Sequence, residues 1–426
     1  MRPVCQLLSL LIVCLLCMAC NQNSTSTSPN ITPTPIKTSL PAITEEIKSP
    51  AKINSQSPKL IKTPDGKVLM SWLEKLDEKQ YTFYFATLEN NAWSSPQLIS
   101  KGDNWFINWA DIPSITKLPD GSLAAHWLVK SSVNTYAYDI NIVRSFDNGQ
   151  TWSSPILPHT DGTKTEHGFV SLFSWDKDKL GAIWLDGRKI KINDKGEYNE
   201  EDLSNEMTLR FTAIDKLGKL SDETSLDERV CDCCPTSVAI TSKGAIAVYR
   251  DRSKEEFRDI SIVRYQEGKW SEPKTLYPDK WQINGCPVNG PVIVAKDDKV
   301  AAAWFSLAND KATVKLMFSS DAGVNFNSPI TIAEGDTVGR VDLVMLDDGS
   351  VLVSWLSGST EKGNINISRV WPDGKQSKPI ATLETTIARK SGIPKLTYIN
   401  NKIIIAWTDP NTSCVRTNSL DIDKLK

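Results

Sequence analysis

One structural unit recurs along most of the chain. Each copy has an apolar run, a tight turn that is often Asp-Gly, and a second apolar run that ends in an aromatic residue. Apolar runs joined by such turns are typical of β-hairpins. The closing aromatic residues of the seven copies are Trp72, Trp127, Trp184, Tyr249, Trp304, Trp355 and Trp407. The repeat therefore limits the chain to an all-β architecture built from equivalent units.

The length of the repeat indicates what each unit is. Successive closing aromatic residues lie between 51 positions apart (Trp304 to Trp355) and 65 positions apart (Trp184 to Tyr249). This period matches a four-stranded propeller blade. We therefore predict an all-β β-propeller of four-stranded blades, with seven blades, and six as the alternative. The last unit ends one strand short, so we expect a strand from residues 43–53 to close the ring.

The first 20 residues have the pattern of an export signal. Arg2 precedes an apolar stretch over residues 7–19, which is too short to span a bilayer. Its end, Cys-Met-Ala-Cys at 17–20, resembles the lipobox of bacterial lipoproteins. The resemblance implies cleavage before Cys20 and acylation of the Cys20 thiol. The alternative is an ordinary signal peptide followed by a buried or reactive cysteine.

A polar segment follows the signal. Residues 21–57 are rich in Ser, Thr, Pro and Asn, and such a segment cannot bury enough apolar surface to fold. We interpret it as a tether that leads to a propeller of residues 58–426. Asn21, next to the expected acylation site, favours the outer membrane by the same resemblance. The sequence thus predicts an exported protein with a lipid anchor in the bacterial envelope.

The charge balance excludes one class of partner. The chain has 49 basic and 51 acidic residues, a net charge of −2, and no basic run of five or more. We therefore expect no nucleic-acid binding. The expected partners are a glycan or small anionic ligand and, through the anchor, a membrane. The protein itself is expected to be a monomer.

Two turns carry a specific pattern, Ser-x-Asp-x-Gly followed by an aromatic residue. The Asp carboxylate of such a turn can accept hydrogen bonds from turn amides, and the Gly permits positive φ. The turns resemble the Asp-box of the bacterial neuraminidase (BNR) repeat found in sialidase-like propellers. Their residues are Ser145, Asp147, Gly149 and Trp152, then Ser319, Asp321, Gly323 and Phe326.

Propeller geometry predicts which residues share a site. The first strand of every blade begins at the face where its second strand ends, so the residues flanking these points converge on one mouth. Arginines beside acids at such a mouth suit a small anionic or polyhydroxylated ligand. The alternative is an ion-paired rim that only ties loops together. The expected substrate-binding residues are His167, Asp186, Arg188, Arg250, Asp251, Arg252 and Arg340.

The sialidase resemblance adds roles for some of these residues. It implies an exo-glycosidase acting on terminal sugars, specifically an exo-α-sialidase, that requires no cofactor. Arg188, Arg250 and Arg340 would form its arginine triad. Asp111 would be the acid, and Tyr198 with Glu200 or Glu201 the nucleophile pair. The family's Arg-Ile-Pro motif is absent, so a non-catalytic glycan- or protein-binding propeller is the alternative.

A cysteine cluster offers a different chemistry. Cys231, Cys233 and Cys234 precede the first strand of one blade, and Cys286 precedes that of the next. We expect a disulfide between the two segments. The alternatives are a soft metal ion such as copper or zinc, with His167 as a further ligand, and redox-active or free thiols.

Overall fold

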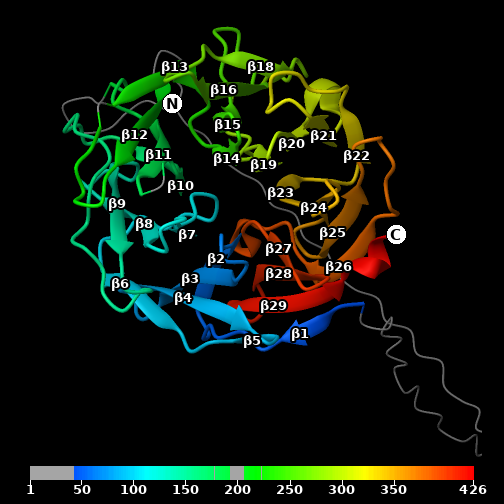
Figure 1. Cartoon of the computed structure of the whole chain (residues 1–426), viewed down its shortest axis with the longest axis horizontal. Helices are drawn as coiled ribbons and strands as arrows, with labels where there is room; N and C mark the ends of the chain where they lie inside the picture. The colour runs from blue at the N-terminus through cyan, green and yellow to red at the C-terminus, as the bar shows by residue number, and fades with distance from the viewer. Residues whose placement is uncertain (1–42, 177, 192–205, 222) are drawn as a thin grey trace, which may run out of the picture. The chain divides into compact units, whose positions relative to one another are not determined.

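The computed structural model describes residues 43–176, 178–191, 206–221 and 223–426. It is a seven-bladed β-propeller, as the repeat predicts, and the blades follow one another around a central axis (Figure 1). The expected signal, Cys20, Tyr198, Glu200 and Glu201 lie outside the described residues. Within the described part, no helix has the length and apolar character required to cross a bilayer.

The first four blades follow the chain from β2 to β18, and adjacent strands are antiparallel. Blade one contains β2 (Ser55–Lys62), β3 (Val68–Lys75), β4 (Tyr81–Glu89), β5 (Ala92–Trp93) and β6 (Gln97–Gly102). Blade two contains β7 (Ser114–Lys117), β8 (Leu123–Lys130) and β9 (Tyr138–Ser145). Blade three contains β10 (His167–Ser174), β11 (Leu180–Asp186), β12 (Met207–Ile214) and β13 (Thr224–Val230). Blade four contains β14 (Ser237–Thr241), β15 (Gly244–Arg250), β16 (Ile260–Gln266), β17 (Lys269–Trp270) and β18 (Lys274–Tyr277).

The remaining blades complete the ring, and the last of them includes a strand from the start of the domain. Blade five contains β19 (Val292–Lys296), β20 (Lys299–Ser306), β21 (Thr313–Ser319) and β22 (Ile330–Glu334). Blade six contains β23 (Gly339–Met345), β24 (Val351–Gly358), β25 (Gly363–Val370) and β26 (Ile380–Thr385). Blade seven contains β27 (Lys395–Ile399), β28 (Lys402–Asp409), β29 (Cys414–Asp421) and β1 (Glu45–Ile47). The described residues also form three short 3₁₀ helices: η1 (Ala308–Asp310), η2 (Arg389–Ser391) and η3 (Ile422–Leu425).

The ring is closed by pairing the two ends of the domain. Strand β1 is antiparallel to β29, with Glu45 opposite Ser419 and Ile47 opposite Thr417. The Thr417 hydroxyl also donates to the Ile47 carbonyl at 2.7 Å. The prediction of a closing strand from residues 43–53 is confirmed. The propeller therefore begins ahead of the boundary at residue 58, because polar residues can form an outer strand that needs little burial.

The recurring aromatic residues hold neighbouring blades together. The described core divides into seven apolar clusters, and each spans one blade and the next. Each closing aromatic residue lies in the cluster shared with the preceding blade. Trp72 of blade one, for example, packs with Ile404 and Ala406 of blade seven and is fully buried. The repeated tryptophans therefore act in packing between sheets, where a large ring buries the most surface.

The inner strands are irregular where they begin. Strands β2, β10 and β23 each have a β-bulge near their first residues. Non-glycine residues at these bulges have positive φ: 58° at Ser57, 52° at Phe169 and 53° at Arg340. Bulges re-aim side chains and strained backbone is concentrated at functional sites. The three bulges therefore indicate a functional site at the end of the propeller axis where the inner strands begin.

The two patterned turns form the hydrogen bonds expected from their residues. Asp147 accepts from the Thr151 amide at 2.9 Å, and Asp321 accepts from the Asn325 amide at 3.0 Å. Gly149 has a φ of 86°. The first turn follows the end of β9, which pairs with the beginning of β8. It therefore lies at the face opposite to the mouth and contributes to stability.

Substitutions of two glycines in blade two can distinguish the effect of backbone strain on stability from that of side-chain packing. Gly121 and Gly149 both have φ near 86°, but a Cβ at 121 would meet no atom within 4 Å, whereas one at 149 would lie 2.4 Å from the Phe85 ring. We expect Gly121→Ala to lower the free energy of unfolding by about 1–2 kcal/mol through the left-handed backbone alone. Gly149→Ala should lower the free energy of unfolding by about 1–3 kcal/mol more than Gly121→Ala does, because the Phe85 ring must move. Denaturant midpoints of both variants measure the difference, and equal midpoints would contradict it.

Candidate functional site

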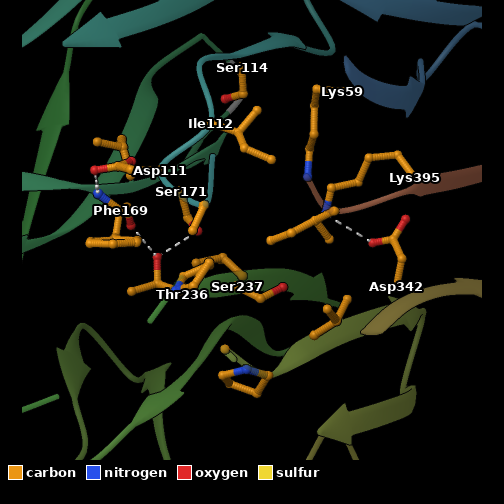
Figure 2. A pocket seen from close by; sticks show the side chains of 18 of the residues that line it. Lys59, Asp111, Ile112, Ser114, Phe169, Ser171, Thr236, Ser237, Asp342 and Lys395 are labelled. Atoms are coloured by element: carbon orange, nitrogen blue, oxygen red, sulfur yellow. Dashed lines mark hydrogen bonds and ion pairs between the residues drawn. The ribbon is translucent and has the colours of Figure 1, made fainter. Parts of the chain in front are cut away.

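A cavity of about 180 Å³ lies on the axis at the face where the inner strands begin. All seven blades contribute to its wall, including Lys59 from blade one, Asp111 from blade two and Asp342 from blade six. The convergence of inner-strand starts on one mouth is therefore present in the structure. Figure 2 shows Asp111 and Phe169 on one side of the cavity and Lys59, Lys395 and Asp342 on the other.

The basic side of the cavity contains two lysines and one carboxylate. Lys395 Nζ lies 3.5 Å from Asp342 Oδ1, and Asp342 Oδ2 accepts from the Leu396 amide at 2.7 Å. The Lys59 ammonium has neither an ion pair nor a hydrogen bond with any residue that the structure describes. Burial, helped by the nearby charge of Lys395, lowers the pKa of Lys59 to about 8. Lys59 thus remains largely charged at neutral pH and faces the cavity without a partner.

The acidic side is a chain of two carboxyl groups joined by a phenol. Asp111 Oδ2 accepts from the Phe169 amide at 2.9 Å, and the Asp111 carboxyl group also contacts the Tyr138 hydroxyl. That hydroxyl donates to Glu166 Oε1 at 2.5 Å. Burial raises the pKa of Asp111 to about 7. Burial raises the pKa of Glu166 well above its usual range, and the negative charge of Asp232 adds to the effect.

The bulge in β10 explains how this chain is assembled. The positive φ of Phe169 points its amide at Asp111. Gly168 leaves the necessary room, since a Cβ there would lie 2.2 Å from Asp111 Oδ2 and 3.1 Å from the Tyr138 hydroxyl oxygen. The Tyr138 ring is held by stacking on Phe106, with ring centroids 3.9 Å apart. Asp111 Oδ1 is buried and makes no hydrogen bond with the described residues.

The arginines expected to bind substrate are engaged elsewhere. Arg250 donates to the backbone carbonyls of Asn289 and Phe305, at 2.7–2.9 Å, and is almost fully buried. Arg340 donates to backbone carbonyls around η2, including that of Gly392 at 2.9 Å, and stacks on Trp109. A guanidinium has five donors and can satisfy several carbonyls at once. These two arginines therefore fix loops and do not form an open triad with Arg188.

The remaining rim residues form a network of charges. Arg188 pairs with Asp186 at 2.6 Å and with Glu223 at 2.8 Å. His167 Nε2 lies 3.2 Å from Asp161 Oδ1. Two further rim residues have partners of their own: Arg252 pairs with Glu256 at 3.0 Å and Asp251 accepts from the Ser261 hydroxyl at 2.9 Å. The alternative of an ion-paired rim describes these residues better than substrate binding does.

The cysteine segments meet at the same mouth. The Cys231 sulfur lies 3.8 Å from that of Cys233 and 3.6 Å from that of Cys234. All the described cysteines, Cys286 included, are free thiols. The expected disulfide between the 231–234 segment and Cys286 is therefore not formed in the structure.

Sequence reasoning missed three residues of the cavity site. Lys59 and Lys395 lie inside predicted inner strands, where the sequence alone cannot show which way a bulge turns a side chain. Tyr138 opens the third strand of blade two, and nothing in its neighbourhood distinguished it from a core tyrosine. Asp111 was among the predicted site residues, as the acid that the sialidase resemblance implies.

Comparisons with known proteins concern the fold. No protein-family model matches the sequence, and no curated protein is significantly similar to it. Among solved structures, a protein of unknown function from Dyadobacter fermentans has a TM-score of 0.51 at 13% identity, over 88% of this chain and 96% of that one. A mutant of the NanB sialidase from Streptococcus pneumoniae has a TM-score of 0.47 at 12% identity, over 85% of this chain and 84% of that one. An α-L-arabinofuranosidase of Fusarium graminearum has a TM-score of 0.48 at 14% identity, over 90% of this chain and 98% of that one.

The raised pKa of Asp111 predicts a pH-dependent stability. Because the folded state holds the Asp111 proton more tightly than the unfolded state, this group's contribution is largest below about pH 4 and falls as the pH rises toward 7. Asp111→Asn keeps an acceptor for the Phe169 amide but cannot ionise. Between pH 4 and pH 7, Asp111 should lower the unfolding free energy of the wild type by as much as about 4 kcal/mol. We expect Asp111→Asn to lack this part of the decline.

Denaturant unfolding at several pH values measures this slope. Asp147→Asn is the matched control, because hydrogen bonds in its turn lower the pKa of Asp147 and keep its titration below this range. An Asp111→Asn protein with the same slope as the wild type would contradict the assignment.

Proposed function

We propose that the protein is an exo-acting glycoside hydrolase whose substrate ends in an acidic sugar. One observation carries this proposal: the axial cavity places the unpartnered Lys59 ammonium and the carboxyl group of Asp111, with a pKa of about 7, in the same small space. A cation can hold the acidic group of a sugar, and a carboxyl group that is protonated near neutral pH can donate a proton to a glycosidic oxygen.

The size and charge of the cavity support this substrate class. Its volume of about 180 Å³ lies below the range of roughly 300–1,000 Å³ that is usual for ligand pockets. It therefore suits a single terminal residue rather than a length of polymer. Two lysines and one ion-paired carboxylate leave an excess of positive charge when Asp111 is protonated. The acidic group would thus be recognised by lysine, not by the arginine triad of sialidases.

The chemical step uses two carboxyl groups in different surroundings. Asp111 would carry its proton on Oδ1, the oxygen without a partner among the described residues, and pass it to the leaving-group oxygen as the glycosidic bond breaks. Asp342, held by the Leu396 amide and Lys395, would accept a proton from the attacking water. Two carboxyl groups whose environments differ in this way are the usual acid and base of glycoside hydrolysis.

Tyr138 and Glu166 are positioning residues in this scheme. The Tyr138 hydroxyl contacts the Asp111 carboxyl group and donates to Glu166. It therefore fixes the Asp111 carboxyl group and links it to Glu166, whose pKa is also raised. Removing the hydroxyl should change the protonation of Asp111 without removing the acid itself.

Fluorogenic glycosides of sialic acid, a uronic acid and neutral sugars test the activity. We expect hydrolysis of an acidic glycoside and a fall in kcat of about 10²–10⁴-fold in Asp111→Asn. Lys59→Gln should raise KM for the acidic substrate. Turnover that is unchanged in Asp111→Asn would overturn the mechanism. If the protein binds acidic glycans but hydrolyses no glycoside, it is a binding propeller.

The role of Tyr138 is tested by the pH profile. Tyr138→Phe should shift the limb of the kcat profile that reports Asp111. Tyr249→Phe is the matched control, because Tyr249 is also a buried tyrosine that donates to a carboxylate, Asp227, at 2.6 Å. It removes a comparable hydrogen bond from the core of the domain and should leave the profile in place. The same shift in both variants would show a general loss of stability.

We also propose that residues 1–20 direct export and that Cys20 carries the lipid anchor. The support is the apolar stretch and the lipobox-like end of that segment. In a bacterial host, Cys20→Ala should move the protein from the membrane fraction to the soluble fraction. Mass spectrometry of the wild-type N-terminus should find acylated Cys20, and a protein with an unmodified Cys20 would contradict the proposal.

A further inference from the structure

A cluster of thiols at the mouth is separate from the groups that line the axial cavity. After β13 the chain makes a tight turn over residues 231–234, and the Cys231 amide donates to the Arg250 carbonyl at 3.0 Å. The turn brings the sulfurs of Cys231, Cys233 and Cys234 to within 4.8 Å of one another. Cys233 and Cys234 are adjacent in the sequence, and both of their sulfurs lie beside that of Cys231.

The distances within the cluster match those of metal thiolates. A tetrahedral ion with metal–sulfur bonds of about 2.3 Å has sulfurs about 3.8 Å apart. The measured separations from Cys231 are 3.8 Å to Cys233 and 3.6 Å to Cys234. We propose that Cys231, Cys233 and Cys234 bind one thiophilic metal ion, Cu⁺ or Zn²⁺, independently of the activity of the axial cavity.

A buried cation supports the thiolate form of these residues. Arg258 Nη1 lies 3.2 Å from the Cys231 sulfur, and Arg258 is 2% exposed. A neutral thiol is a weak acceptor, so a guanidinium aimed at sulfur suits a thiolate. Three thiolates around one Cu⁺ or Zn²⁺ would leave excess negative charge, and Arg258 offsets part of it. Glu256 holds the guanidinium in place at 2.7 Å.

The cluster has a closed side and an open side. Cys231 and Cys234 are buried, Cys233 is half-buried, and Cys286 is exposed. Ligand atoms of Cys286, Asp232 and Cys233 form a second group within 4.8 Å of one another. Cys233 therefore belongs to both groups. Cys286 and Asp232 offer the fourth donor on the side where an ion can enter or exchange.

Soft sulfur ligands select among metals. Thiolates favour Cu⁺ and Zn²⁺ over Mg²⁺, Ca²⁺ or Mn²⁺, which prefer oxygen. Two other groups of possible ligands in the described part contain no sulfur: Asp161 with His167 and Asp186, and Asp139 with His159 and His167. Asp186 is already paired with Arg188. The sulfur cluster is therefore the site where a thiophilic ion would bind first.

Metal titration of the purified full chain tests the proposal. After reduction and removal of metals, the protein is titrated separately with Cu⁺ and Zn²⁺ against chromogenic chelators. We expect one equivalent of at least one of these ions to bind, with the loss of three or four titratable thiols. Cys231→Ser and Cys234→Ser should each weaken binding by at least about 100-fold, and Cys286→Ser by less. Arg258→Lys should weaken it about 10–100-fold, as for other residues that support metal ligands.

Cys414→Ser is the matched control, because Cys414 lies in blade seven beside the Ala51 and Lys52 carbonyls, away from the cluster. It should bind metal as the wild type does. Circular dichroism of each variant without metal separates loss of the ligand from loss of the fold. Binding of neither ion, or binding that survives both Cys231→Ser and Cys234→Ser, would overturn the proposal. A disulfide among these three cysteines in the freshly isolated protein would overturn it as well.

Discussion

The pairing of β1 with β29 is the constraint on which the rest of the structure depends. It gives blade seven its outer strand from the other end of the domain, and it fixes blade seven against blade one. Each of the seven apolar clusters lies between two blades, so the Trp72 cluster exists only in the closed ring. Opening the ring would expose that surface and an unpaired strand edge. It would also remove the cavity wall that Lys59 and Lys395 form together.

The arrangement of cations at the mouth follows from the chemistry of arginine and lysine. Arg250 and Arg340 are buried with their donors directed at backbone carbonyls, and in this way they hold the loops that precede the inner strands. Lysine has a single ammonium group on a flexible stem and suits a position at a cavity wall. Lys59 is placed there by the bulge in β2. The arginines therefore support the site and a lysine presents the free charge.

Two kinds of chemistry share the mouth because neighbouring blades contribute to it. The carboxyl chain comes from blades two and three, and the thiol cluster comes from the loops before β14 and β19. Glu166 lies where they meet, since both Asp111 and Asp232 influence its protonation. Hydrolysis at the axial cavity and metal binding at the rim are separate proposals.

The sequence by itself determined the propeller, because the period of the hairpin repeat and its closing aromatic residues leave few other folds for the chain. It also placed Asp111 and the cysteines at one mouth, since strand order fixes which loops meet. Tertiary structure alone decided which of those residues are available for chemistry. Two of the carbonyls that Arg250 binds lie 39 and 55 positions away in sequence, and no local pattern indicates them. Whether Lys59 faces the axis depends on a bulge, because one inserted residue reverses the face to which a strand's side chains point.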